Sequence, residues 1–550
     1  MQPADATILE SPIAYLSAEF GFDPALPIYA GGLGILSGDT MKQAADENLP
    51  FVGVGLLYRG QYMRQTITPA GEQVEEQWQF DPVAVGLEHV YIDGDQPLFI
   101  SVQIATETVW LRCWKKTFSE QTILYLLDSD TDQNPPHLRK ITQFLYAGDS
   151  DYQLKQEIVH GIGAVQLLKA LDIVPHLYHF NEGRPVFAHW QLILDVMENH
   201  QVAAESALRL VKNKVVYTNH TLVAAGNMNY PISVLSPLAE PYANKMGIST
   251  SQLLSLGSSG NPDAYSVTTA ALNVSHIASG VSKIHTELSK QLWPDYNWVN
   301  ITNGVHRATW QDTEIKQSAA QPDKLWQRHL QLKNHLRDFT QASTGFGYDS
   351  NRLVIAWARR IAGYKQLGSL FSDIEKLREI CSQQDRQVQI VVSGKAHFGD
   401  SNGKELLKEV IHHFSTVLAG YALFIPNYNL EVAQFLTRGA DIWLNTPIKG
   451  KEASGTSGMK AISNGVLQMT VQDGWTSEVD WEGLGWVLAS ESLTESFQAN
   501  LRTAQDMYFS RNEQGFSDEW VARMQRSILT YEDFSTERML AEYKEKLYNA

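Results

Sequence analysis

The sequence contains few cysteines, no excess of positive charge and no long apolar run. Two cysteines, Cys113 and Cys381, are too few for a disulfide framework or a cysteine-based zinc site, which fits a reducing compartment. A net charge of −17 argues against a general nucleic-acid or anionic-membrane surface. No run of about 18 apolar residues could cross a bilayer, and the N-terminus MQPADATILESPIAYLSAEF has no basic region followed by an apolar core. These absences predict a cytoplasmic protein without a nucleic-acid partner, a membrane partner or a metal site.

The length and the composition indicate a globular protein with more than one domain. A chain of 550 residues exceeds one ordinary hydrophobic core, so two large domains are expected. Hydrophobic residues make up 43% and charged residues 19%, which excludes a mainly disordered chain.

The second half alternates between apolar runs and amphipathic segments. The segments predicted as strands are 353–360, 389–396, 422–428 and 441–446, and those predicted as helices are 367–380, 404–418 and 431–439. Strands that are apolar on both faces and separated by helices form a parallel sheet covered on both sides. This half is therefore predicted to be a doubly wound, Rossmann-like domain.

The first half is more mixed. Strand-like segments such as IAYLSAEF, FVGVGLLY, TILYLLDS and KVVYTNH are separated by helical ones such as KQEIVHGIGAVQLLKAL. We place a domain boundary near 303–310, giving an N-terminal α/β domain (1–303) and a C-terminal one (304–550), and we allow the last helices to pack back on the first domain. The predicted fold class is α/β, with two doubly wound domains facing each other across a cleft, as in B-type glycosyltransferases.

Two turns follow or precede predicted elements in a way that suits an anion. Gly31, Gly32, Leu33 and Gly34 open a predicted helix, where glycines let the backbone approach a ligand and the helix N-terminus favours negative charge. A tight structural turn is an equally good interpretation. In WARRIAGYKQ (357–366), the residues Arg359, Arg360 and Lys365 follow a predicted buried strand, where guanidinium and ammonium groups could hold phosphate. The alternative there is a solvated basic turn.

The segment KEASGTSGMKAISNG (451–465) combines small polar residues with a lysine near its end. Its hydroxyls and glycines could wrap a phosphate or a sugar, Glu452 could accept from sugar hydroxyls, and Lys460 could bond to an aldehyde cofactor. From composition alone, a polar surface turn remains open. The single His220 after KVVYTN is more often structural than catalytic, and ITNGVHRATW (301–310) could be only a hinge with a packed Trp310.

Taken together, these segments resemble the α-glucan (glycogen, starch, maltodextrin) phosphorylase family. EASGTSGMK (452–460) is similar to the pyridoxal-phosphate lysine motif of that family. The other matching motifs come in the family's order: YLSAEF, GGLG, VYTNHT, SHxxxGVxxIH (275–285), ITNGVHRATW, RRIAGYK, SGKA and IPNYN. The likeness covers about residues 13–475. YAGGLGILSGD (29–39) and GVGLLYRGQYMRQ (53–65) resemble the short, mostly microbial branch.

The resemblance implies phosphorolysis of α-1,4-glucans to α-glucose 1-phosphate with retention, pyridoxal 5′-phosphate as cofactor, inorganic phosphate as co-substrate and a homodimer. It implies that Lys460, Arg360, Lys365 and His220 are catalytic. The implied cofactor-binding residues are Lys460, Arg359, Thr456, Ser457, Trp310, Tyr428 and Gly32. The implied substrate-binding residues are Gly31, Gly32, Leu33, Asn303, Glu452, Ser454 and Gly455.

The sequence departs from the family pattern at several positions, and the AISNG that follows Lys460 differs mildly from the usual AxLNG. HFNEGRPVF (179–187) has Arg184 where the family usually carries His near the sugar, and Gln366 replaces a usual Arg after YK. Arg184 puts acceptor geometry in doubt and keeps open a non-catalytic, glucan-binding homologue. A nucleotide-sugar-dependent glucan synthase is a second alternative, although such enzymes lack the lysine motif. A pyridoxal-phosphate aminotransferase fits less well, because it would carry no glucan motifs.

Overall fold

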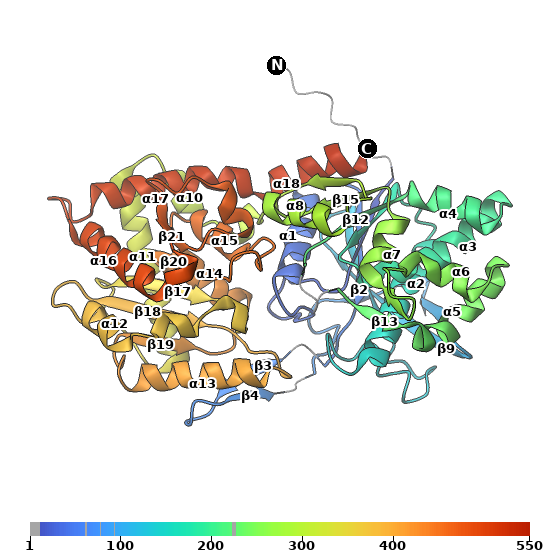
Figure 1. Cartoon of the computed structure of the whole chain (residues 1–550), viewed down its shortest axis with the longest axis horizontal. Helices are drawn as coiled ribbons and strands as arrows, with labels where there is room; N and C mark the ends of the chain where they lie inside the picture. The colour runs from blue at the N-terminus through green and yellow to red at the C-terminus, as the bar shows by residue number, and fades with distance from the viewer. Residues whose placement is uncertain (1–10, 61–62, 77–78, 93, 223–226, 550) are drawn as a thin grey trace, which may run out of the picture.

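The computed structural model describes residues 11–60, 63–76, 79–92, 94–222 and 227–549, and it contains two large β-sheets, one in each half of the chain (Figure 1). Residues 1–10, whose composition predicts no signal sequence, lie outside these ranges, as do Gln61 and Tyr62 of the GVGLLYRGQYMRQ motif. Among the described residues, no helix is both long enough and apolar enough to cross a membrane.

The first sheet is built around a parallel core. Its strands are β1 (Ile13–Ser17), β2 (Phe51–Leu56), β5 (Glu88–His89), β8 (Phe99–Ile104), β9 (Glu107–Thr117), β10 (Thr122–Asp128), β11 (Leu177–Asn181), β12 (Val215–Thr218), β15 (Ile277–Gly280) and β16 (Trp298–Asn300). Counted in chain order, the parallel strands β10-β2-β1-β11-β12-β15-β16 run 3-2-1-4-5-6-7 across the sheet. The order reverses between β1 and β11, and sheets of this kind bind ligands beyond the carboxyl ends of the strands at such a reversal.

An antiparallel extension distinguishes this sheet from the predicted one. Strands β9, β8 and β5 continue the sheet beyond β10 in antiparallel order. Buried and more exposed residues alternate along β8, as they do in strands with one solvent-facing side. The doubly wound prediction for the first half is therefore correct for the parallel strands and wrong for this extension, which needs no covering helices on its outer face.

The second sheet is parallel throughout. Its strands are β17 (Leu353–Ala358), β18 (Val388–Ser393), β19 (Ala422–Ile425), β20 (Ile442–Asn445), β21 (Leu467–Thr470) and β22 (Gly485–Val487). In the order β19-β18-β17-β20-β21-β22 they run 3-2-1-4-5-6, the doubly wound order, with the reversal between β17 and β20. Each of the four strands predicted in 353–446 is confirmed.

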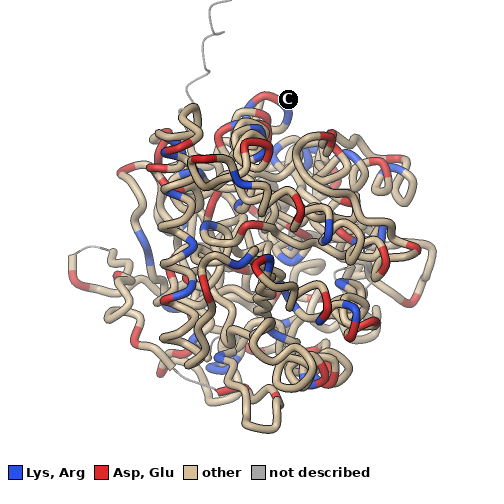
Figure 2. The backbone as a smooth tube through the Cα atoms, turned by 90° about the vertical axis from the view of Figure 1, so that its left-hand side faces the viewer, with Lys and Arg blue, Asp and Glu red and all other residues tan. Residues whose placement is uncertain are grey.

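Helices flank both sheets (Figure 1). Those of the first half are α1 (Gly32–Asp46), α2 (Ser150–Ala170), α3 (Ala188–His200), α4 (Ala204–Lys212), α5 (Ile232–Met246), α6 (Thr250–Leu254), α7 (Val267–Val274) and α8 (Lys283–Leu292). Those that follow are α9 (Arg307–Trp310), α10 (Thr313–Ser318), α11 (Pro322–Thr344), α12 (Ile374–Cys381), α13 (Ser401–Ser415), α14 (Leu430–Gly439), α15 (Ser457–Ile462), α16 (Leu493–Phe509), α17 (Asp518–Thr530) and α18 (Thr536–Tyr543). In the view of Figure 2, basic and acidic residues are interspersed along the backbone.

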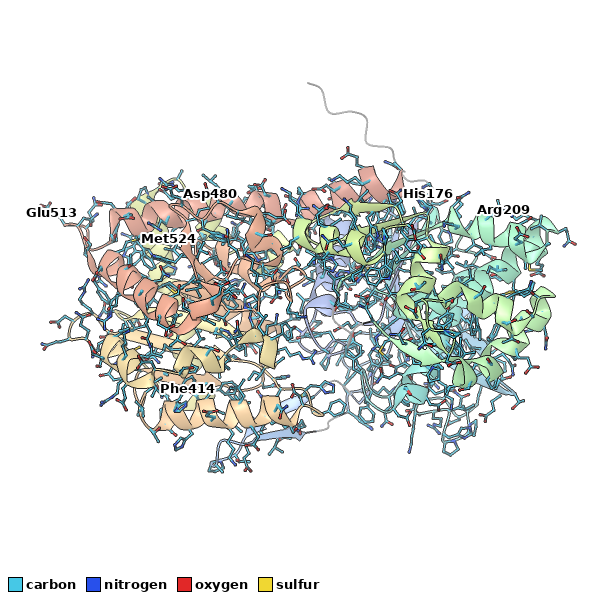
Figure 3. All side chains as sticks on the ribbon, in the orientation of Figure 1. His176, Arg209, Phe414, Asp480, Glu513 and Met524 are labelled. Carbon is cyan, nitrogen blue, oxygen red and sulfur yellow. The ribbon has the colours of Figure 1, made fainter. Side chains whose placement is uncertain are left out.

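The C-terminal segment packs into the core of the first half. α18 lies beside α1 (Figure 1), and Met539, Leu540 and Tyr543 belong to the same buried cluster as β1 and β2. The Tyr548 hydroxyl lies 2.9 Å from Nδ1 of the buried His179, and the Tyr548 carbonyl accepts from the ring of His176, which Figure 3 labels. The first-half core thus includes residues from both ends of the described chain.

A hairpin of the first half reaches the second sheet. Strands β3 (Arg64–Ile67) and β4 (Gln73–Glu76) lie against α13 (Figure 1). Gln65 and Gln73 donate to the carbonyls of Gly394 and Ala396, which follow β18, at 2.9 and 2.8 Å. Lys395 returns a hydrogen bond of 2.9 Å to the Met63 carbonyl. The two halves are therefore joined here as well as through the chain itself.

Candidate active site

The polar groups of interest lie at the two strand-order reversals. In the second sheet, Arg359 directly follows β17, and the loop 446–456 follows β20. In the first sheet, Glu19 comes just after β1 and Glu182 just after β11. Because parallel strands end at the same edge of a sheet, these side chains gather where such folds bind ligands.

Lys460 lies on the short helix α15 and is buried, with 5% of its surface exposed. Its Nζ lies 4.0 Å from the centroid of the Trp310 ring, within cation–π distance. Burial lowers the pKa of Lys460 to about 8, although the charge of Asp39 acts in the opposite direction. The lowered pKa gives this amine a larger uncharged, nucleophilic fraction near neutral pH than an ordinary lysine has.

Asp39 brings helix α1 of the first half to this lysine. Its carboxylate accepts from the Trp310 indole N–H at 2.8 Å and from the backbone N–H of His306 at 3.2 Å. Burial raises the pKa of Asp39, against the attraction of Lys460 and other nearby cations. Trp310 thus contacts both Asp39 of the first half and Lys460 of the second, and these contacts join the two halves.

A second cluster places two cations around one carboxylate. Glu452 accepts from Lys365 in a short hydrogen bond and from Arg359 Nη1 at 3.3 Å. Arg359 Nη2 also donates to the Ser457 hydroxyl at 3.4 Å. Burial alone raises the pKa of Glu452, but Lys365 and Arg359 outweigh it and hold this pKa below its ordinary value. Burial lowers the pKa of Lys365 to about 8, against the opposing effect of Glu452.

The loop before Lys460 is anchored to its surroundings. Asp473 accepts from the backbone N–H groups of Lys451 and Glu452 at 3.1 and 2.9 Å, and the Ser454 carbonyl accepts from Trp475 N–H at 3.1 Å. Gly455 has a φ of +84°, a left-handed conformation that glycine adopts without strain. This segment is not the loose surface turn that its composition also allowed.

Several buried polar atoms in this region have no hydrogen-bond partner among the described residues: Nε of Arg359, Oγ of Ser454 and Oδ1 of Asn303. Buried polar atoms are normally hydrogen-bonded, so unpartnered ones call for an explanation such as a ligand or water. All three belong to residues that the sequence predicts to bind cofactor or substrate.

The remaining predicted residues of the second half take different positions. The side chain of Arg360 is exposed, and its charge reaches His397 and Tyr364. Tyr428 lies close enough to Arg359 for the cation to lower its pKa, although burial raises that pKa to about 12. Thr456 immediately precedes α15, and its carbonyl accepts from the Lys460 N–H at 3.4 Å.

His220 is held by the residues that end β11. Its Nε2 lies 2.6 Å from the Asn181 Oδ1, which can only accept, so Nε2 carries the proton. Its backbone N–H donates to Glu182 at 3.0 Å. Burial, with help from nearby His285, lowers the pKa of His220 to about 3, so the ring is neutral and its Nδ1 can accept a hydrogen bond. Burial raises the pKa of Glu182 to about 7, even though it accepts several hydrogen bonds.

The glycine turn opens α1 as predicted. Gly31 precedes the helix, and Gly32 and Leu33 begin it, so their N–H groups have no acceptor within the helix. A Cβ added to Gly31 or Gly32 would meet no atom within 4 Å, which leaves open space beside the turn. The Gly31 N–H, however, already donates to Glu19 at 3.1 Å. Of the predicted backbone donors, Gly32 and Leu33 are therefore the ones left for an anion.

Contacts between the halves connect these groups. Ser282 Oγ, within the SHxxxGVxxIH motif (275–285), donates to the Ala453 carbonyl at 2.7 Å. Asn303 donates through its backbone to Val281 at 3.1 Å, and its carbonyl accepts from Arg538 at 3.0 Å. His285, near His220, lies on the same helix α8 that Ser282 caps. Asn303 thus connects through Val281 and Ser282 to the loop that holds Ser454 and Gly455.

The Arg184 side chain contacts Glu157 and Tyr146. Its Nη1 lies 3.0 Å from Glu157 Oε1 on α2, and its guanidinium lies over the Tyr146 ring, 4.5 Å from the centroid. Burial raises the pKa of Glu157 to about 7, against the opposing effect of Arg184. The structure thus gives this departure from the family pattern a buried partner of its own.

Three acidic residues of the site were not predicted from the sequence: Glu19, Asp39 and Glu182. All three lie inside segments described above: YLSAEF, YAGGLGILSGD and HFNEGRPVF. An acid on the buried face of an apolar segment is the signal that could have identified them, because burying a carboxylate without a partner is costly.

Comparison with known proteins gives consistent results. The model of the carbohydrate phosphorylase family matches residues 311–483. The chain is 35% identical to a maltodextrin phosphorylase of Thermococcus litoralis, over 98% of this chain and 71% of that protein. It is 31% identical to a glycogen phosphorylase of Mycobacterium tuberculosis, over 99% of this chain and 71% of that protein. It is also 30% identical to an uncharacterized protein of Methanocaldococcus jannaschii, over 98% and 99% of the two chains.

Proposed function

Because the chain belongs to the carbohydrate phosphorylase family, we propose that it cleaves α-1,4-glucans with inorganic phosphate. The product is α-D-glucose 1-phosphate, formed with retention of configuration from the non-reducing end of glycogen, starch or maltodextrin. The reaction takes place in a cleft between two domains, residues 1–303 and 304–550, arranged as in B-type glycosyltransferases. The names of the similar proteins, maltodextrin and glycogen phosphorylase, support this substrate class.

The observation that carries the proposal is the clustering of Arg359 and Lys365 on Glu452, within the loop that leads to Lys460. Two cations close to a single carboxylate leave positive charge for an anion, in a chain whose net charge is −17. Charge-assisted hydrogen bonds from such groups suit phosphate oxygens.

The residues around Lys460 fit pyridoxal 5′-phosphate. The buried amine of lowered pKa suits covalent attachment of an aldehyde, and Trp310 offers a flat face beside it. Arg359 has an unpartnered Nε and lies next to the Ser457 hydroxyl, so both can hold the cofactor phosphate, together with Thr456, Tyr428 and Gly32. When bound, the cofactor would supply a phosphate able to exchange a proton with the substrate phosphate.

The chain's own residues then act by charge and position. Lys365 and Arg359, with Arg360, offset the repulsion between anions brought close together. The Gly32 and Leu33 N–H groups add backbone donors. His220 accepts a hydrogen bond from a sugar hydroxyl at Nδ1, because its Nε2–H already donates to Asn181. Other sugar hydroxyls pair with Asn303, Glu452, Ser454 and Gly455. Closure of the cleft excludes water that would otherwise hydrolyse the glucosyl group.

The test is phosphate-dependent release of glucose 1-phosphate from maltodextrins of graded length, with bound-cofactor absorbance measured on the same sample. Borohydride reduction should fix the cofactor on Lys460, as peptide mapping would show, and a Lys460→Ala variant should retain none. Absence of cofactor from the purified protein would refute the proposal. Glucosyl transfer from a nucleotide sugar would favour a glucan synthase, and glucan binding without turnover a non-catalytic homologue. Light scattering on the same sample tests the homodimer.

A further inference from the structure

The glycine turn at the start of α1 is fixed by a buried carboxylate. Glu19 is 3% exposed, and its Oε2 accepts from the backbone N–H groups of Ala30 at 2.6 Å and Gly31 at 3.1 Å. A Cβ added to Gly34 would lie 2.8 Å from the same oxygen, so the helix and the carboxylate are in close contact. The direction of the free Gly32 and Leu33 N–H groups therefore depends on where Glu19 lies.

The second oxygen of Glu19 is held by Tyr146. The Tyr146 hydroxyl donates to Glu19 Oε1 at 2.7 Å. Tyr146 has a φ of +55°, a left-handed conformation that is uncommon for an aromatic residue. Such a backbone persists when the surrounding contacts over-determine it, and it is found most often at functional sites.

Arg184 holds the ring of Tyr146 in place. The guanidinium lies over the ring at 4.5 Å, while its edge reaches Glu157 Oε1 at 3.0 Å and Gln153 Oε1 at 3.4 Å on α2. The planar guanidinium can stack by its face and donate by its edge at the same time, which a smaller imidazole could not do over these distances. Arg184 and Glu157 are both largely buried, with side-chain exposures of 14% and 2%.

We propose that Arg184 is a positioning residue for substrate phosphate, acting through Tyr146 and Glu19 on the glycine turn. The series Glu157–Arg184–Tyr146–Glu19 runs from helix α2 to the first residues of α1, and each link is a direct contact. It aims the Gly32 and Leu33 N–H groups at the position of the phosphate. The departure at residue 184 then serves the phosphate end of the site rather than the sugar. This inference rests on the proposed function.

The test uses Tyr146→Phe, which keeps the ring under Arg184 and removes only the hydroxyl that Glu19 accepts. Loss of a hydrogen bond to a charged group should raise the KM for inorganic phosphate about tenfold, with the KM for maltodextrin changed less than about twofold. Arg184→Lys, which cannot stack and donate together, should give the same pattern. Tyr242→Phe is the matched control, because its buried hydroxyl donates to the Gln103 carbonyl, away from α1.

A second measurement does not depend on turnover. Inorganic phosphate alone should raise the Tm of the wild type and of Tyr242→Phe, and Tyr146→Phe should need about tenfold more phosphate for the same rise. Equal increases in both KM values, or a wild-type phosphate response in Tyr146→Phe, would overturn the positioning role. A normal Tm response to phosphate without any glucose 1-phosphate release would instead refute the proposed function alone. A wild type with no response to phosphate in either measurement would overturn both.

Discussion

Replacing Glu452 with glutamine tests the charge balance of the basic cluster. Glu452 accepts from both Lys365 and Arg359, and its charge raises the pKa of Lys365, which burial lowers to about 8. A hydrogen bond to a charged group is worth about 1.5 to 3 kcal/mol, and one pKa unit corresponds to about 1.4 kcal/mol. The Glu452→Gln variant should therefore lower the pKa of Lys365 by about one to two units.

The sign of the effect on phosphate binding follows from the charge of the lysine. Only protonated Lys365 attracts phosphate. Phosphate binding is therefore strong below the pKa that Lys365 has in the phosphate-free protein, and it weakens as pH rises through that pKa. In the wild type this loss should be centred near pH 8. In Glu452→Gln it should be centred about one to two units lower, while at acidic pH the variant should bind phosphate at least as well, because a competing carboxylate is gone.

The assay is the pH dependence of 1/KM for phosphate, which reports groups of the free enzyme, supported by calorimetric binding of phosphate to the same samples. The ionisation of phosphate itself is common to both proteins and cancels in the comparison. Glu478→Gln is the matched control. Glu478 also lies where the two halves meet, but it accepts from Thr302 and from the Lys283 N–H instead of from the basic cluster. An alkaline limb that stays near pH 8 in Glu452→Gln would refute the reasoning.

The other predictions concern single side chains. Lys365→Ala should raise the KM for phosphate about ten- to a hundredfold. Arg360→Ala, at an exposed position, should also raise this KM, without lowering Tm. Wild-type phosphate dependence in both variants would contradict the role of the turn 357–366. Arg184→His should lower Tm rather than raise activity, because Glu157 loses the cation that offsets its charge. Burial raises the pKa of Glu157 to about 7 against the opposing effect of Arg184, so removing Arg184 should raise this pKa further. The variant should then keep losing stability as pH rises above about 7, where the wild type no longer does. The Tm deficit of Arg184→His should therefore be larger at about pH 8 than at about pH 6, and an equal deficit at both would contradict this. Trp310→Phe removes the indole N–H that a buried carboxylate accepts, which should cost about 1 to 3 kcal/mol in urea unfolding; an unchanged midpoint would contradict that contact.

The parts of the fold that could be predicted are those whose pattern is local. The run Leu353–Ala358 is buried along its whole length, and a strand with two apolar faces needs helices on both sides. That single property predicts the parallel second sheet, and the family resemblance drawn from the motifs is confirmed by the comparisons. Strand order and the antiparallel extension depend on which strands pair, which no local pattern specifies.

The candidate site shows the same division. The resemblance identified Lys460 and Trp310, and the structure puts the lysine over the indole ring. The partner of Asp39 could not be identified from the sequence, because Trp310 lies 271 residues further along the chain. Arg184 stands where the family usually carries His near the sugar, and Glu157 is recognisable as its partner only after α2 is packed against the first sheet.

The return of residues 536–548 to the first half has a consequence for how the chain folds. Thr536 donates to Gln43, 493 positions earlier, and the side chains that follow fill the core beneath β1. The first half is synthesised well before residues 536–548. Until those residues are made, one side of its hydrophobic core stays exposed. The second sheet draws its strands from 353–487 and can close without such distant partners. We therefore expect the half that is made second to finish folding first, and the half that is made first to be the one that relies on chaperones during synthesis.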